Sequence, residues 1–260
     1  MSDLARPRHH LVHRLARPAA RGWLLAAVLL GNVGLAEAGG SATFVAGDDL
    51  SDPTAQMVRS RIEFDRPTRV RLQVDPTAEF TLDGYLVVRD STAYAVANLQ
   101  EQTMVFEYEQ AMASLGGIAR NLAPRSLVTD GRFVSLDGPG RSETIAGFAG
   151  RVWLLTTENR AGQRRTDEIV LTRDPRVQEL TEALLATGRI AAKALPELDA
   201  EANERLAAEL RQRGTGILRI GNSFLLERLD PATPVAARFA LPAEPSVLPN
   251  LRSFGSLFGQ

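Results

Sequence analysis

Apolar and polar side chains alternate with a period of two through most of residues 57–173 of this 260-residue chain. Turn-forming residues such as Gly, Asp, Asn and Ser interrupt the alternation at short intervals. Such a pattern is typical of antiparallel strands that bury one face and expose the other. The sequence therefore predicts a run of antiparallel strands over this part of the chain.

Two segments, Met57–Phe64 and Val70–Asp75, form the clearest pair of strands. When Ile62 is placed opposite Leu72, the apolar side chains of both segments fall on one face and oppositely charged side chains fall on the other. A shift of one residue would turn both apolar sets to the polar face, so the pattern predicts this register for a hairpin.

Other segments complete the order of elements. Helices are predicted over Ala111–Leu122, from Asp174-Pro175 onward, and over Ala200–Arg213. At the second of these, Asp174 caps the helix and Pro175 suits its first position. Further strands are predicted near Gly84–Arg89, Ala93–Asn98, Thr103–Tyr108, Arg132–Leu136, Glu143–Ala146, Arg151–Thr157, Thr166–Thr172, Ile217–Leu229 and Val235–Leu241. This order predicts an α+β fold, in which a large curved antiparallel β-sheet, or half-barrel, has helices packed on one face.

The first 38 residues have the order of a secretory signal. Five arginines precede an apolar stretch over residues 23–36, and Ala36-Glu37-Ala38 has the small-x-small pattern of a cleavage site. We expect cleavage after Ala38 and a periplasmic or secreted protein. A retained signal anchor is the alternative, although the apolar stretch is shorter than the roughly 20 residues that span a membrane.

The remaining chain divides by composition. Residues 39–56 are expected to be a mobile entry segment, and residues 57–242 a β-rich domain with a helical insertion over 174–213. Pro, Ser and Gly are frequent in residues 243–260, which are expected to form a loose C-terminal tail.

The composition excludes several kinds of chemistry for the expected mature chain. The sequence has no cysteine, and its three histidines all precede residue 38. Ser-His-Asp and Cys-His catalysis and Cys/His zinc sites therefore lack their residues. No cofactor or metal is expected, and the absence of a basic excess argues against nucleic-acid binding. Asp167, Glu168 and Glu143 leave a carboxylate-based hydrolase as a minor hypothesis.

Two sets of side chains are candidates for binding. The large apolar groups on predicted strands either fill the core of the sheet or line an open groove in its concave face, and they are Phe64, Leu72, Tyr94, Phe106, Trp153 and Phe224. An arginine group on the first hairpin could bind an anion, or could belong to a charge-balanced outer face in which Arg71 pairs with Glu63; it comprises Arg59, Arg61, Arg69 and Arg71.

The order of elements and several short stretches resemble the lipoprotein-carrier-like (LolA-like) superfamily, especially its uncharacterised secreted members. The similar stretches are Tyr85–Asp90 with Ala93–Val96, Glu143–Phe148, Thr166–Thr172 running into Asp174-Pro175, and Phe239–Pro242. The resemblance implies a half-barrel with an apolar concave face. It does not imply lipoprotein trafficking, because no carrier-specific functional residue is matched.

The sequence thus favours an exported, non-enzymatic periplasmic protein that binds an apolar or amphipathic, lipid-like ligand in the concave face of its sheet. The alternative is a structural or protein-interaction module of the cell envelope with an envelope protein as its partner. The third hypothesis is the carboxylate-based hydrolase.

Overall fold

The computed structural model describes residues 39–47, 49–52, 54–55, 57–76, 83–99, 102–115, 131–159, 161–194 and 200–246. The predicted signal segment, residues 1–38, and most of the predicted tail lie outside these residues, as does the second half of the helix predicted over Ala111–Leu122.

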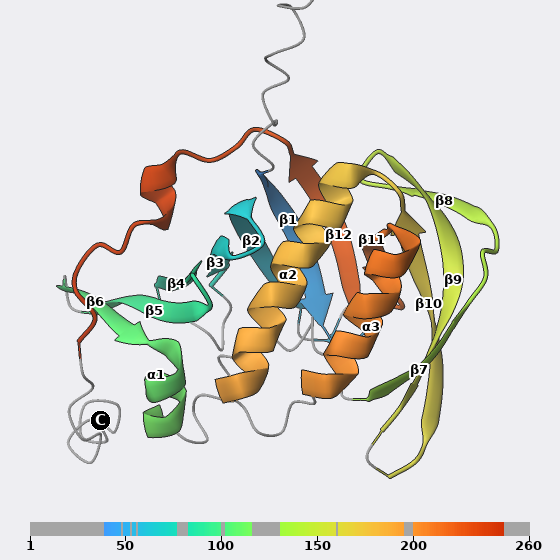
Figure 1. The fold of residues 1–260 in the computed structure, drawn as a ribbon, viewed down its shortest axis with the longest axis horizontal. Coiled ribbons are helices and arrows are strands. Elements are labelled where there is room, and N and C mark those ends of the chain that lie inside the picture. The colour runs from blue at the N-terminus through green and yellow to red at the C-terminus, as the bar shows by residue number, and fades with distance from the viewer. Residues whose placement is uncertain are drawn as a thin grey trace, which may run out of the picture. The chain divides into compact units, whose positions relative to one another are not determined.

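Twelve strands form one antiparallel sheet in the described residues (Figure 1). Their order across the sheet is β6-β5-β4-β3-β2-β1-β12-β11-β10-β9-β7, and β8 pairs with the part of β9 that β7 leaves uncovered. Among the described residues β6 and β7 do not pair, so the sheet is open, and the predicted fold class is confirmed. The strands are β1 (Gly40–Gly47), β2 (Met57–Arg66), β3 (Arg69–Val74), β4 (Gly84–Arg89), β5 (Thr92–Leu99), β6 (Gln102–Glu107), β7 (Arg132–Asp137), β8 (Ser142–Ile145), β9 (Phe148–Glu158), β10 (Arg164–Thr172), β11 (Gly216–Ile220) and β12 (Phe224–Asp230).

The predicted register of the first hairpin is confirmed. Ile62 stands opposite Leu72 and Glu63 opposite Arg71, so the apolar members face the core and the charged members the other side. Ile62 and Leu72 are both almost fully buried. Cross-strand pairing of matched side chains stabilises the hairpin on both of its faces.

The strand β1 corrects the prediction of a mobile entry segment over residues 39–56. It lies between β2 and β12 in the middle of the sheet and alternates buried with half-buried residues. Ala42, Phe44 and Ala46 provide its buried face. The prediction missed this strand because its side chains are mostly small and give only a weak apolar alternation. Its pairing with β12 joins residues far apart in the sequence, which a local pattern does not reveal.

The closing strands also differ from the prediction. A turn at Gly221–Ser223 divides the predicted strand Ile217–Leu229 into the hairpin β11–β12. Gly221 has a φ of 47°, in the left-handed region that glycine adopts without strain, which explains the break at this position.

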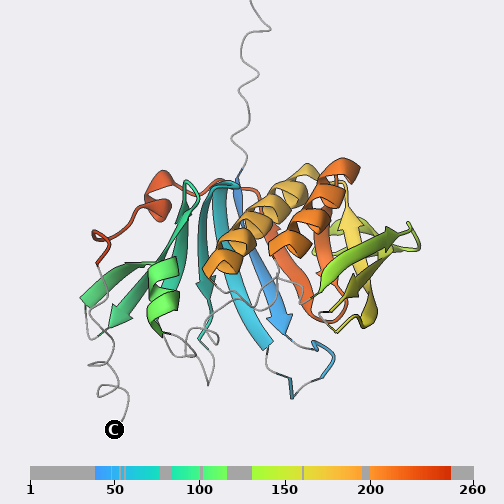
Figure 2. The same ribbon diagram turned by 60° about the horizontal axis from the view of Figure 1, so that its bottom comes forward.

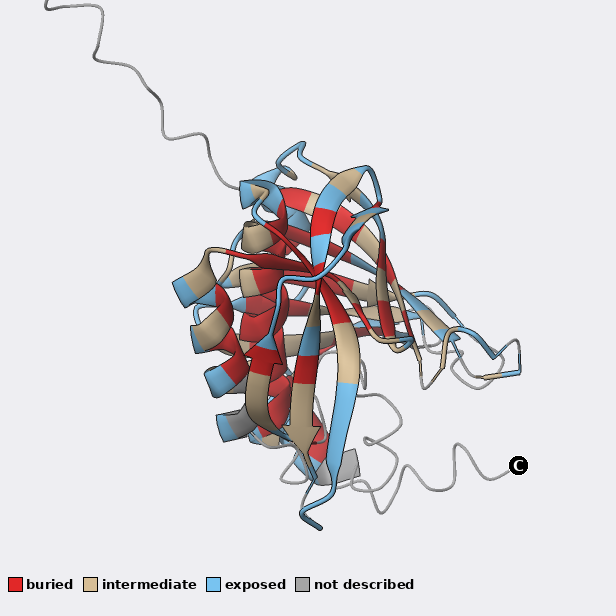
Figure 3. Ribbon diagram, turned by 90° about the vertical axis from the view of Figure 1, so that its right-hand side faces the viewer, coloured by how far each residue is buried: buried red, intermediate tan, exposed pale blue. Residues whose placement is uncertain are grey.

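Two of the three described helices cover the concave face of the sheet, namely α2 (Pro175–Ala194) and α3 (Ala200–Arg213), whereas α1 (Tyr108–Leu115) lies beside β5 and β6 (Figure 2). The backbone N–H of Arg176 donates to Oδ1 of Asp174 at 3.0 Å, which caps the start of α2 as predicted. Figure 3 shows that the buried residues concentrate between these helices and the sheet. No described helix is long and apolar enough to cross a bilayer.

The segment 231–246, called the strap here, runs over the opposite face of β2–β6. The predicted strand Val235–Leu241 is wrong, because the strap forms a 3-10 helix, η2 (Ala236–Phe239), and both neighbouring positions of β12 are already taken by β1 and β11. Individual side chains of the strap make contacts in place of a strand ladder. Arg238 donates to both carboxylate oxygens of Glu63 at 2.9 and 3.0 Å, and Phe239 is buried.

The end of the strap covers a small second apolar cluster on that face. Val87, Val96 and Val105 are buried there, and Leu241 packs against them. The N–H of Ser246 donates to the carbonyl of Val105 at 2.8 Å, on the edge strand β6. The strap therefore shields apolar surface and part of a sheet edge, which would otherwise favour association.

Candidate functional site

The concave face of the sheet is packed by helix side chains in the described residues. From α2, Val177, Leu180 and Ala183 are fully buried, and from α3 Leu206 and Leu210 join the same core. Their spacing of three or four residues places them on the faces that meet the sheet. Most of the apolar face therefore contacts protein.

The six apolar side chains predicted to bind a ligand are not brought together as one surface. Phe64, Leu72 and Phe224 lie in the main core under the helices, with at most 3% of each exposed. Phe106 is also buried. Tyr94 packs against the second apolar cluster, which the strap covers.

Trp153, the sixth predicted residue, is half-buried at the edge of the main core. The guanidinium of Arg213, at the end of α3, lies 4.6 Å from the centre of a Trp153 ring. This stacking places a cation over the aromatic face, where the ring quadrupole attracts it.

Every arginine of the predicted anion-binding group contacts a carboxylate. Arg59 makes a two-point contact with Glu227 at 2.9 Å for both bonds. Arg69 lies 2.7 Å from Asp65. Arg61 and Arg71 both approach Glu63, at 3.3 and 3.5 Å. The contact between Arg71 and Glu63 is the pair named in the charge-balanced interpretation of this face.

The acids that motivated the hydrolase hypothesis are partly brought together. One nitrogen of Arg219 lies 3.0 Å from Glu143 and 3.2 Å from Glu168. Arg141 makes two further hydrogen bonds to Glu168, at 2.6 and 2.8 Å. These bonds lower the pKa of Glu168 from 4.5 to about 2, because they stabilise its ionised form.

The pKa of Glu168 gives a prediction for acid stability. A lowered pKa in the folded state adds stability above pH 4.5, and this contribution is lost as the pH falls toward 2. We expect Glu168→Gln to flatten the decline in the urea midpoint between about pH 5 and about pH 3. The same change at Glu109, an exposed carboxylate of α1, is the control. If the urea midpoint declines equally with falling pH in both variants and in the unmodified chain, the role of the Glu168 pairs is contradicted.

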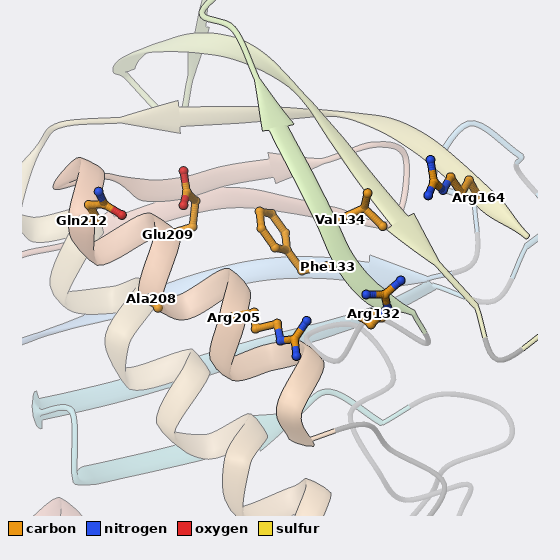
Figure 4. A pocket seen from close by; sticks show the side chains of 8 residues that line it. All are labelled: Arg132, Phe133, Val134, Arg164, Arg205, Ala208, Glu209 and Gln212. Carbon is orange, nitrogen blue, oxygen red and sulfur yellow. The ribbon is translucent and has the colours of Figure 1, made fainter. Parts of the chain in front are cut away.

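A pocket of about 510 Å³ lies between α3 and the edge strand β7, beside the packed core (Figure 4). The wall from α3 comprises Arg205, Ala208, Glu209 and Gln212. These positions follow the helical spacing i, i+3, i+4 and i+7, so they form one stripe beside the buried stripe of Leu206 and Leu210.

A β-bulge shapes the opposite wall of the pocket. Phe133 stands opposite Thr157 and Ser135 opposite Thr156, so Val134 is an extra residue in β7. A bulge locally bends a strand and changes the direction of its side chains. Phe133 and Val134 give this wall its apolar surface, and Figure 4 shows the Phe133 ring projecting from β7 toward α3.

Arginine and glutamate side chains both contribute charge at the pocket. Arg132 and Arg164 both bind Glu158, through bonds of 2.7 and 3.1 Å. These two bonds lower the pKa of Glu158, and the bond to Glu158 raises the pKa of Arg132. Arg205 contacts Glu201 on the exposed side of α3. Glu209, which lines the pocket, accepts a hydrogen bond from Arg213 at 2.6 Å.

The pocket therefore joins three guanidinium groups to an apolar wall. Guanidinium groups bind carboxylates and phosphates through paired hydrogen bonds, and such bonds are stronger when both partners are charged. The volume lies in the range of about 300–1,000 Å³ that is common for small-molecule sites. In the described residues, no group of three or more His, Asp or Glu side chains could hold a metal ion.

Sequence reasoning did not find this pocket. The only available signal was the arginine-containing polar face of the helix predicted over Ala200–Arg213, which is also expected of any solvent-exposed helix. The contact between α3 and β7 joins parts of the chain about 70 residues apart, and no spacing rule predicts this contact or the bulge at Val134.

Comparisons with known proteins give little further information. No protein-family model matches the chain, and no curated protein matches it. A search of solved structures found the crystal structure of the LolA superfamily protein NE2245 from Nitrosomonas europaea, at 10% sequence identity and with a TM-score of 0.22. The matched region covers 53% of this chain and 60% of that chain, so the present chain spans less than two thirds of the neighbour's length.

Proposed function

We propose that this protein is a non-enzymatic binding protein for an amphipathic anion, and that the pocket between α3 and β7 is its site. The observation that carries the proposal is the combination of Arg132, Arg164 and Arg205 with the apolar side chains of Phe133 and Val134 in one open surface pocket. The anionic group would lie against the arginines, and the apolar part would lie against β7.

Two separate interactions support binding in this arrangement. An anionic head group would replace water around partly exposed guanidinium groups, whose other bonds go to Glu158 and Glu201. The apolar part would gain about 25 cal/mol for each Å² of apolar surface removed from water. A ligand that carries both features is favoured over one that carries either alone.

We further propose that the protein acts outside the cytoplasm, after cleavage of residues 1–38. The basic segment, the short apolar stretch and Ala36-Glu37-Ala38 support export. A chain without cysteine needs no disulfide formation and folds in an oxidising compartment without mispairing. The mass of the protein recovered from the periplasm tests this: we expect a chain that starts at Gly39, and a chain that starts at Met1 would contradict export with cleavage.

Isothermal titration with four probes tests the proposed site. Decyl phosphate carries both features, decanol lacks the charge, inorganic phosphate lacks the chain, and decyltrimethylammonium reverses the charge. We expect decyl phosphate, below its micellar concentration, to bind at least about tenfold more tightly than each of the others, a difference of about 1.4 kcal/mol. Equal affinity for decanol and decyl phosphate would exclude a role for the arginines.

Substitutions locate the binding in the pocket. Arg205→Ala is expected to weaken decyl phosphate binding about tenfold with little effect on decanol, because it removes one charged partner. Ala208→Trp places a large side chain in the pocket and should abolish binding of both. The controls are Arg228→Ala, at an exposed arginine of β12, and Ala113→Trp, at an exposed position of α1. Equal losses in the control variants would place binding elsewhere.

A further inference from the structure

The first described residue, Gly39, is closely enclosed by the fold. Its neighbour Gly40 stands opposite Phe64 in the ladder between β1 and β2, so Gly39 lies opposite Asp65. A Cβ atom at Gly39 would come within 2.9 Å of the Phe64 carbonyl oxygen and of a methyl carbon of Thr233. The backbone at this position therefore fits between β2 and the strap, in a space that only glycine fills without a shift.

Asp65, opposite Gly39, has a buried oxygen without a hydrogen bond. Its Oδ2 pairs with Arg69 at 2.7 Å, and its side chain is only 14% exposed. Its Oδ1 is inaccessible to solvent and accepts no hydrogen bond from the described residues, and its ion pair with Nε of Arg66 is long, at 3.7 Å. A buried carboxylate oxygen without a donor costs about 1–3 kcal/mol or more, so a native protein normally satisfies it.

We propose that cleavage after Ala38 creates at Gly39 an α-ammonium group whose partner is Oδ1 of Asp65. The inference rests on the proposed export, and it adds the group in the folded chain that receives the new terminus. Hydrolysis of the Ala38–Gly39 peptide bond consumes one water, leaves a carboxylate on Ala38 and gives an ammonium at Gly39.

The new group differs from the amide that it replaces. The amide of an uncleaved chain has one N–H, and the planar peptide fixes its direction. The ammonium has three donors and rotates freely about the N–Cα bond, so it can donate in directions that the planar amide cannot while Gly39 keeps its close position. A hydrogen bond between two charged partners is also about twice as strong as a neutral one.

The neighbouring charges allow this pair. On the β2–β3 hairpin, Arg69 occupies the other oxygen of Asp65, and the exposed Arg66 extends away from the core. On β12, Asp230 accepts the N–H of Ala232 and lies 3.8 Å from Arg228. Among the described residues Oδ1 of Asp65 thus has only the long ion pair with Arg66, and a terminus bound there would join β1, β2 and the strap at one point.

The single lysine of the chain, Lys193, makes a selective experiment feasible. The full-length gene carrying Lys193→Arg is expressed with export, and the N-terminal residue of the recovered protein is determined by mass. In a protein that begins at Gly39, the α-amine is then the only primary amine. Acetylation with an amine-specific reagent removes its charge and leaves every side chain unchanged.

We expect acetylation to lower Tm by about 2–4 °C, and to leave Tm unchanged when Asp65→Asn is also present. A crystal structure of the mature form should place the Gly39 nitrogen within hydrogen-bond distance of Oδ1 of Asp65. A terminus at Met1 would contradict export itself. A terminus at Gly39 whose acetylation leaves Tm unchanged, or shifts it equally in both chains, would contradict the ion pair alone.

Discussion

Replacement of Phe224 by Ala is expected to destabilise the protein by about 3–5 kcal/mol. The Phe224 side chain is fully buried at the start of β12. Its ring centre lies 5.3 Å from that of Phe44 on the neighbouring strand β1. The substitution removes this aromatic contact and leaves a cavity that the paired strands cannot close.

Equilibrium urea unfolding measures the effect, and Phe224→Leu is the control. The leucine side chain fills most of the same volume, so its cost should be clearly smaller. The sequence alone also allowed Phe224 to line an open ligand groove. A loss of less than about 1 kcal/mol in Phe224→Ala would favour that alternative, because a groove residue has few packing partners to lose.

Replacement of Gly216 by Ala is expected to cost about 1–3 kcal/mol, although it adds only one methyl group. A Cβ at Gly216 would lie 2.5 Å from the carbonyl carbon and oxygen of Val177 and 2.6 Å from the nitrogen of Gln178. These atoms belong to the backbone of the first turn of α2. Because they cannot rotate away, the helix as a whole must move from β11.

A matched glycine tests this explanation by thermal or urea unfolding. A Cβ at Gly140 would meet one atom, the carbonyl oxygen of Val152, at 3.3 Å. We expect Gly140→Ala to cost clearly less than Gly216→Ala. A similar loss for both would mean that glycine is needed for another reason than the close approach of α2 to β11.

Local alternation and turn chemistry predicted much of the sheet. The register of β2 and β3 followed from Ile62 and Leu72, because a shift by one residue reverses both faces of a strand. The bounds predicted for β4, Gly84–Arg89, agree with those observed. The cap at Asp174 correctly marked the start of α2.

The same rules assigned the wrong face where small residues point inward. On β5, Ala93 belongs to the main core, whereas the larger Tyr94 lies on the opposite face beside the cluster under the strap. The size of a side chain therefore misled the prediction that Tyr94 contributes to the concave face. Ala93 is only 3% exposed there, although its side chain is small.

The strap and the pocket were beyond prediction for a different reason. Arg238 contacts Glu63 across 175 positions of the sequence, and no pattern near either residue predicts this contact. The arginines of the pocket come from β7, β10 and α3. Their common location depends on the order of strands in the sheet, which a single sequence leaves open.

The structure of the protein crystallised with decyl phosphate tests the central claim most directly. We predict the phosphate within hydrogen-bond distance of Arg132 and Arg205, with the alkyl chain against Phe133 and Val134. A ligand seated instead between α2 and the sheet, in contact with Leu72, would contradict the assignment of the pocket between α3 and β7 as the binding site.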